Sequence, residues 1–215
     1  WRVITCSRTE VAPQCPWEKN KKDHFQIDLE DLDDLRKKVK DLQALLKGKP
    51  VKALINNAAI SPKNEKNNRL NFDETDVNLW QKVFNVNFFS PIILSKSLIP
   101  NLQSANGVII NITSIASDMV HEFAGPAYAT SKAALKSLTR EMASDLSQYN
   151  IRVNAIAPSA FKTDMFNKMD KTSKKKLLKD SKLKRPLSIK SVADKILFLS
   201  SSASNKINGK IIKKF

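Results

Sequence analysis

The sequence is poor in glycine, which numbers only four among 215 residues. Its two cysteines, Cys6 and Cys15, are too few for a disulfide framework and have no metal-ligand partners in the pattern around them. No apolar run approaches the roughly 20 residues that cross a bilayer, and no signal-peptide pattern is visible. These absences argue against disulfide-rich and membrane-spanning classes. We expect a protein of the reducing cytoplasm without a bound metal, with Cys6 packed inside a strand.

Arginine is also scarce, although the formal net charge is +16. Lysine supplies most of the positive excess and is scattered over predicted helix faces and loops. Nucleic-acid readers rely on arginine and, for single strands, on aromatic residues interleaved with basic ones. We therefore predict no nucleic-acid partner. The densest basic segment, residues 171–185, predicts a local positive field that would favour an anionic substrate or an acidic carrier.

Strand-like and helical segments alternate along the chain. Short apolar runs predict strands at residues 2–7, 24–29, 51–55, 107–112, 151–157 and 209–212. Apolar residues at helical spacing predict helices at residues 31–46, 77–98, 128–149 and 192–200, the last capped near Ser188 or Ser191. This alternation predicts the doubly wound α/β class, a parallel Rossmann-like sheet with helices on both faces. Residues 1–215 are expected to form a single domain.

Polar residues follow three of the predicted strands. These are Asn56 and Asn57, Thr113 and Ser114, and Pro158 and Ser159. In an open parallel sheet, ligands bind at the carboxyl ends of the strands. The sequence therefore predicts that separate segments bring these polar groups to one crevice.

Tyr128 and Lys132 are the chemical pair of this sequence. Their i, i+4 spacing places both side chains on one side of a helix. A phenol has a pKa near 10 and is a poor acid or base at neutral pH. A nearby ammonium favours the phenolate, so we expect Lys132 to lower the pKa of Tyr128 and tune it for acid–base work.

Taken together, Tyr128 with Lys132, Ser114 after a buried strand, and Asn56 with Asn57 resemble the active site of the short-chain dehydrogenase/reductase family. Members of that family move a hydride between a nicotinamide cofactor and a carbonyl or alcohol. The resemblance covers almost the whole chain and implies an oxidoreductase acting on a small-molecule carbonyl or alcohol. A catalytically inactive relative that serves as a binding or scaffold protein is the alternative.

The resemblance implies a catalytic tetrad of Asn87, Ser114, Tyr128 and Lys132. Tyr128 would exchange a proton with the substrate oxygen, and Ser114 would donate a hydrogen bond to it. Lys132 would also hold the nicotinamide ribose, and Asn87 would hold a water that relays protons to the lysine. Ser117 is the rival of Ser114, and Asn85 the rival of Asn87.

Cofactor contacts follow from the same resemblance. Asp28 and Leu29 match the site beside adenine, and the remaining candidates are Arg8, Asn57, Ala58, Ala59, Tyr128, Lys132, Pro158, Phe161 and Thr163. In family members that prefer NAD, the strand matching residues 2–7 ends in a carboxylate, which binds the 2′-hydroxyl of the adenosine ribose. This chain has Arg8 there, whose guanidinium can bind a 2′-phosphate, so we predict NADP, with NAD possible.

The family opens with a strand and a glycine-rich phosphate-binding turn, and the sequence starts after the positions of both. We therefore expect an N-terminally incomplete domain, with the absent strand between residues 2–7 and 51–55. Family members also pair the helices matching residues 77–98 and 128–149 across a two-fold axis. Apolar residues on those helices, such as Phe89, Ile92, Ile93, Leu135, Leu138 and Met142, predict a homodimer or homotetramer.

Overall fold

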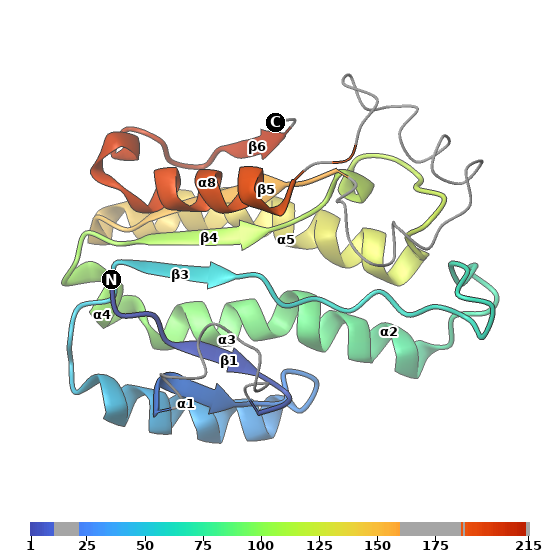
Figure 1. Ribbon diagram of the computed structural model, residues 1–215, viewed down its shortest axis with the longest axis horizontal. Helices are drawn as coiled ribbons and strands as arrows, with labels where there is room; N and C mark the ends of the chain where they lie inside the picture. Colours follow the sequence, from blue (N-terminus) through green and yellow to red (C-terminus); the bar gives the residue numbers. More distant parts are fainter. Residues whose placement is uncertain (11–21, 160–185, 187, 214–215) are drawn as a thin grey trace.

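Parallel strands form two sheets in the computed structural model, which describes residues 1–10, 22–159, 186 and 188–213 (Figure 1). The smaller sheet pairs β1 (Thr5–Ser7) with β2 (His24–Gln26). The larger has the order β3-β4-β5-β6, built from Ala53–Asn56, Val108–Ile112, Arg152–Ala157 and Ile211–Lys213. Every pairing between these strands is parallel. The predicted α/β class with a parallel sheet is confirmed, although several strands are shorter than expected.

β1 and β3 are not hydrogen-bonded to each other, and in the described ranges no strand lies between them. This is the place where an additional strand was expected. The expectation that Cys6 packs inside a strand is wrong, because its side chain is exposed although the residue lies in β1. In the part of the chain that the structure describes, β1 pairs only with β2. No neighbouring strand on the other side of β1 therefore covers the thiol.

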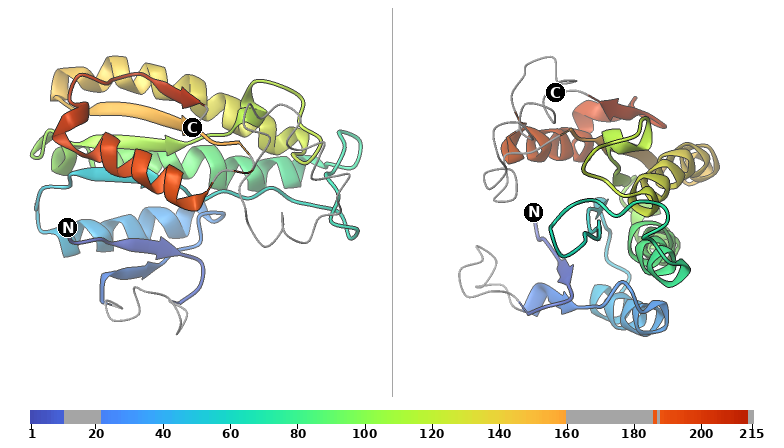
Figure 2. Two further views of the ribbon diagram at one scale, coloured as in Figure 1. Left: turned by 45° about the horizontal axis from the view of Figure 1, so that its top comes forward. Right: turned by 90° about the vertical axis from the view of Figure 1, so that its right-hand side faces the viewer.

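Helices cover both faces of the larger sheet. α8 (Ile189–Ser200) lies on one face, whereas α1 (Leu32–Leu46), α2 (Val77–Phe84), α3 (Ser90–Ser97) and α5 (Pro126–Asp145) lie on the other (Figure 2). Shorter helical segments are α4 (Ile99–Gln103), η3 (Ile115–Ser117), η4 (Leu146–Tyr149) and η5 (Ser202–Ser204). Side chains of a strand alternate between faces. Accordingly, Ile109 packs with Leu102 and Leu146 on one side, while Ile110 packs with Val192 and Leu199 on the other.

Side-chain caps fix where the main helices begin. Asp31 accepts hydrogen bonds from the backbone amides of Asp33 and Asp34 at the start of α1. Ser188 accepts one from the amide of Ser191 at the start of α8, which confirms the predicted cap. Such a cap satisfies amides that have no partner within the helix and stabilises it by about 1 kcal/mol.

The single helix predicted for residues 77–98 is interrupted, which corrects that expectation. A π-helical turn, η2 (Asn85–Phe89), separates α2 from α3. Pro91 supplies the reason, because proline has no N–H and its ring clashes with the carbonyl four residues earlier. The amide of Ser90 instead bonds to the carbonyl of Asn85, five residues back, and its hydroxyl bonds to the same carbonyl. π-turns of this kind occur often at functional sites.

Candidate functional site

The carboxyl ends of β3, β4 and β5 lie side by side and carry the predicted polar groups (Figure 1). Asn56 pairs in register with Asn111, and the amide of its side chain donates to Asn111 Oδ1 over 2.8 Å. The amide and hydroxyl of Thr113 both donate to the carbonyl of Ile156, at 2.8 and 3.1 Å. These bonds fix the segment that leads from β4 into Ser114.

The hydroxyl groups of Ser114 and Tyr128 face each other closely enough for Ser114 to favour the ionised phenol. The backbone amide of Ala116 donates to Ser114 Oγ over 3.1 Å and holds this side chain in place. Burial raises the pKa of Tyr128 above its ordinary value of 10.0, and the hydrogen bond from Ser114 opposes that rise. At neutral pH the phenol therefore keeps its proton.

Lys132 is the largest fully buried side chain in the described part of the molecule. Its Nζ donates to the carbonyl of Ile112 over 2.7 Å and lies 5.9 Å from the centre of the Tyr128 ring. Burial lowers the pKa of Lys132 from 10.5 to about 8, because a charged ammonium is costly away from water. The expected lowering of the pKa of Tyr128 is wrong, because burial of the phenol raises that pKa.

Asn87 lies in the π-turn and is completely buried. Its Oδ1 accepts from the amide of Ile60 at 2.8 Å, and its Nδ2 donates to the carbonyl of Ile60 at 3.0 Å. The same Nδ2 donates to the hydroxyl of Ser131 at 3.0 Å. Ser131 lies beside Lys132 on α5, so the side chain of Asn87 links the π-turn, the segment after β3 and the helix of Tyr128.

The two rival residues have other hydrogen-bond partners. Ser117 donates its hydroxyl to the carbonyl of Ser114 at 2.6 Å and closes the turn of η3. Asn85 donates to the carbonyl of Glu30 at 2.9 Å and accepts from Gln81. Sequence reasoning overlooked Ser90 and Ser131, whose hydroxyls bond within the π-turn and to Asn87. Pro91 was the available signal for the turn, because it stands inside a helical pattern.

Apart from Tyr128 and Lys132, described above, the predicted cofactor residues fall into three groups. Arg8, Asp28, Asn57, Ala58 and Ala59 are exposed, each following the carboxyl end of a strand. Leu29 and Pro158 are buried, and Leu29 packs in a hydrophobic core cluster. Phe161, Thr163 and the basic segment 171–185 lie outside the described residues.

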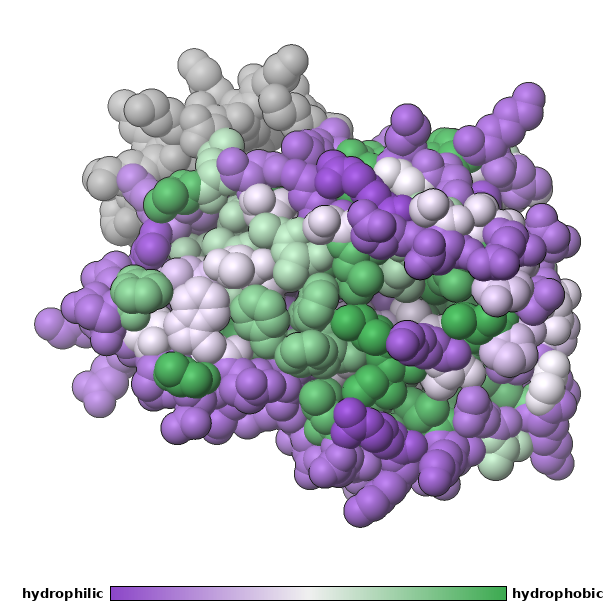
Figure 3. Space-filling model, turned by 180° about the vertical axis from the view of Figure 1, so that it is seen from behind, coloured by the Kyte–Doolittle hydropathy of each residue, from purple (hydrophilic) through white to green (hydrophobic). Residues whose placement is uncertain are grey.

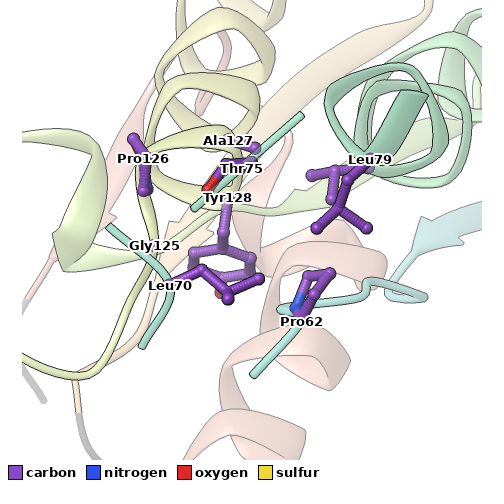
Figure 4. A pocket seen from close by; sticks show the side chains of 9 residues that line it. Pro62, Leu70, Thr75, Leu79, Gly125, Pro126, Ala127 and Tyr128 are labelled. Atoms are coloured by element: carbon purple, nitrogen blue, oxygen red, sulfur yellow. The ribbon is translucent and has the colours of Figure 1, made fainter. Parts of the chain in front are cut away.

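A small apolar pocket lies beside the ring of Tyr128, between α2 and the start of α5 (Figure 4). Most of its lining comes from two segments, the loop before α2 and the turn that begins α5. The lining residues are Pro62, Leu70, Thr75, Leu79, Val83, Gly125, Pro126, Ala127 and Tyr128.

The described residues meet neither the requirements of a metal site nor those of a membrane-spanning helix. No cluster of His, Cys, Asp and Glu suited to a metal ion occurs in residues 1–10, 22–159, 186 and 188–213. Over the same ranges, no helix has both the length and the apolar character needed to cross a membrane.

Comparison with known proteins identifies the family. Residues 7–213 match the family model described as enoyl-(acyl carrier protein) reductase. Protein FixR of Bradyrhizobium diazoefficiens is 42% identical over 210 residues, covering 97% of this chain and 74% of FixR. The chain belongs to the short-chain dehydrogenase/reductase family of oxidoreductases, as the sequence motifs predicted.

Two other relatives extend the comparison. The 5-keto-D-gluconate 5-reductase of Escherichia coli K12 is 32% identical over 166 residues, covering 76% of this chain and 63% of that enzyme. A crystal structure of a short-chain dehydrogenase/reductase family oxidoreductase from Brucella ovis, in complex with a partially ordered NAD, is 44% identical with a TM-score of 0.82. It covers 100% of this chain and 88% of the Brucella protein. The chain thus spans between about two thirds and nine tenths of these relatives.

Proposed function

We propose that the protein reduces a small-molecule carbonyl with a nicotinamide cofactor, and oxidises the alcohol in reverse, with Tyr128 as general acid and base. The observation that carries this proposal is the meeting of the Ser114 and Tyr128 hydroxyl groups beside buried Lys132, whose Nζ lies 5.9 Å from the centre of the Tyr128 ring. In the direction of reduction, a phenol with a raised pKa is protonated at neutral pH and can donate to the carbonyl oxygen. Ser114 would share that oxygen and stabilise the negative charge developing on it.

The described residues fit a nicotinamide cofactor at the carboxyl ends of β1 to β5. Exposed Arg8, Asp28 and Asn57 would hold its adenosine half, and Lys132 would hold the nicotinamide ribose. When bound, the cofactor supplies or accepts the hydride. Lys132 has a pKa of about 8, so it can both carry a proton and release one at nearly neutral pH. Asn87 would complete a proton path to Lys132 through water.

Turnover of carbonyl compounds tests this proposal against the inactive alternative. The protein, as its gene encodes it, would be mixed with NADPH or NADH and a panel of small aldehydes and ketones, and loss of the reduced nicotinamide followed by absorbance. Oxidation of the cofactor that depends on a carbonyl compound supports an enzyme. Tight cofactor binding without oxidation by any compound of the panel would favour a binding or scaffold protein instead.

For the cofactor, we propose NADP over NAD. Arg8 is exposed beyond β1, and no carboxylate stands at that position. The Brucella ovis relative was crystallised in complex with NAD, so NAD is the alternative cofactor here. A charge-assisted contact from a guanidinium to a 2′-phosphate adds about 1.5–3 kcal/mol, which corresponds to roughly 10- to 100-fold in affinity.

Arg8→Glu is therefore expected to weaken NADPH binding by about a hundredfold or more, since it removes the contact and adds repulsion. NADH affinity should change little, and fluorescence titration of both reduced cofactors measures the ratio. Arg36→Glu is the control, because Arg36 is exposed on α1 and pairs with Asp33. An unchanged preference in the Arg8 variant would contradict the assignment to NADP.

We also propose a homodimer or homotetramer built on the face of α2, η2, α3 and α5. Figure 3 shows hydrophobic side chains gathered across the middle of this side of the molecule. Trp80, Phe84, Phe88 and Phe89 form a row with neighbouring ring centres 5.4–6.2 Å apart. Trp80, Phe84 and Phe88 are each only half-buried. Monomeric proteins rarely leave such contiguous apolar patches in water.

Phe89→Glu is expected to convert the assembly to a monomer in light scattering, because Phe89 is 37% exposed at the end of this row and a carboxylate would be desolvated there. Leu135 cannot contribute, contrary to expectation, since it is buried in the chain's own core. Ile189→Glu is the control. Ile189 is 67% exposed on α8, on the opposite face of the sheet. A wild-type protein that is already monomeric would contradict the proposal.

A further inference from the structure

Side chains of β2 form hydrogen bonds with the backbone of the turn that follows β1. Gln26 Nε2 donates to the carbonyl of Arg8 at 2.9 Å. His24 Nε2 lies 3.0 Å from the carbonyl of Thr9, and Ser7 Oγ donates to that carbonyl at 2.7 Å. In the described ranges, no other residue forms a hydrogen bond with these two carbonyls.

Sheet geometry explains why these side chains meet. β1 and β2 pair in parallel, with Thr5 opposite His24 and Ser7 opposite Gln26. Residues two apart in a strand share a face, so all four side chains lie on the same side of the small sheet. The turn after β1 lies against this side of the sheet, where it contacts His24 and Gln26.

Hydrogen-bond chemistry determines the state of the His24 ring. The carbonyl oxygen of Thr9 can only accept, so Nε2 must carry a hydrogen. Thr5 Oγ1 lies 2.8 Å from Nδ1, and in the neutral ring its hydroxyl donates there. Ser7 Oγ lies 3.3 Å from Nε2 and shares that hydrogen. The ring is held at both nitrogens, which makes it a fixed support for the turn.

We propose that His24 and Gln26 are positioning residues for cofactor selection. By fixing the carbonyls of Arg8 and Thr9, they hold the turn in the conformation from which the guanidinium of Arg8 reaches a 2′-phosphate. This inference rests on the proposed binding of the cofactor's adenosine half at Arg8. Neither His24 nor Gln26 needs to touch the cofactor. A turn without these bonds has more conformations to lose on binding, which lowers affinity for the ligand that needs the turn ordered.

Binding constants for NADPH and NADH test this role in the protein as its gene encodes it. One hydrogen bond contributes roughly 0.5–1.5 kcal/mol, so His24→Ala and Gln26→Ala should each weaken NADPH binding by up to about tenfold. NADH affinity should stay within about twofold, because NADH lacks the 2′-phosphate that Arg8 is proposed to bind. His24→Gln should restore most of the loss, since its side-chain amide can donate to the carbonyl of Thr9. Gln43→Ala is the control, because Gln43 donates to the carbonyl of Ser97, away from the turn.

Arg8→Ala distinguishes the possible failures. Loss of NADPH preference in Arg8→Ala, His24→Ala and Gln26→Ala alike supports the inference. If only Arg8→Ala loses the preference, or if the two β2 variants weaken NADPH and NADH equally, the positioning role is overturned while the role of Arg8 stands. An unchanged preference in Arg8→Ala overturns the role of Arg8 and the positioning role with it.

Discussion

Replacing Tyr128 with phenylalanine is expected to lower turnover at least about a hundredfold, because removing a general acid usually costs that much. Only one hydroxyl is lost, and Ser114 Oγ still accepts a hydrogen bond from the amide of Ala116. The fold should therefore survive, with little change in thermal unfolding. Steady-state kinetics with a saturating carbonyl compound gives the turnover number.

Tyr149→Phe is the matched control, since Tyr149 is the only other tyrosine in the sequence. It lies at the end of η4, beyond the far end of α5 from Tyr128. Its replacement should leave turnover unchanged. Normal turnover in Tyr128→Phe would remove this residue from the mechanism.

Replacing Lys132 with methionine is expected to change how stability depends on pH. Burial lowers the pKa of Lys132 to about 8 in the folded protein, whereas the unfolded chain has a value near 10.5. Between these values the unfolded state binds more protons, so the stability of the wild type rises with pH. Below about pH 8 the full cost of burying the ammonium is present, on the order of 3 kcal/mol.

Urea unfolding between pH 7 and pH 10.5 measures this effect. The free energy of unfolding of the wild type, relative to that of Lys132→Met, should increase over the range and level off at its upper end. Lys96→Met is the control, because Lys96 is exposed in the last turn of α3. Parallel curves for the wild type and Lys132→Met would show that the ammonium of Lys132 is not shielded from water.

The sequence predicted the parts of the site that depend on local spacing. Tyr128 and Lys132 are one helical turn apart, and any helix through them brings the pair to one side. Ser114 follows a strand whose five residues are all buried, so its place at the carboxyl end of the sheet could also be predicted. The spacing of apolar residues and the length of the apolar run before Ser114 were enough to predict these positions.

Features that depend on the surroundings could not be predicted in the same way. The pKa of Tyr128 is governed by burial rather than by Lys132, and burial comes from chain segments far apart in the sequence. Ser131 becomes important only because the π-turn rotates Asn87 toward it. Similarly, Trp80 and Leu135 follow the same apolar pattern, yet one is half-buried and the other completely buried.

Transfer of deuterium tests the central claim most directly. The protein, as its gene encodes it, would be incubated with a reduced nicotinamide cofactor deuterated at the reactive ring carbon and with the panel of aldehydes and ketones. Mass spectrometry would then locate the label. We predict one deuterium on the carbon that becomes the alcohol, for the wild type and Tyr149→Phe, and almost none for Tyr128→Phe. Equal labelling by Tyr128→Phe, or no labelled alcohol from a wild type that binds the cofactor, would contradict the proposed function.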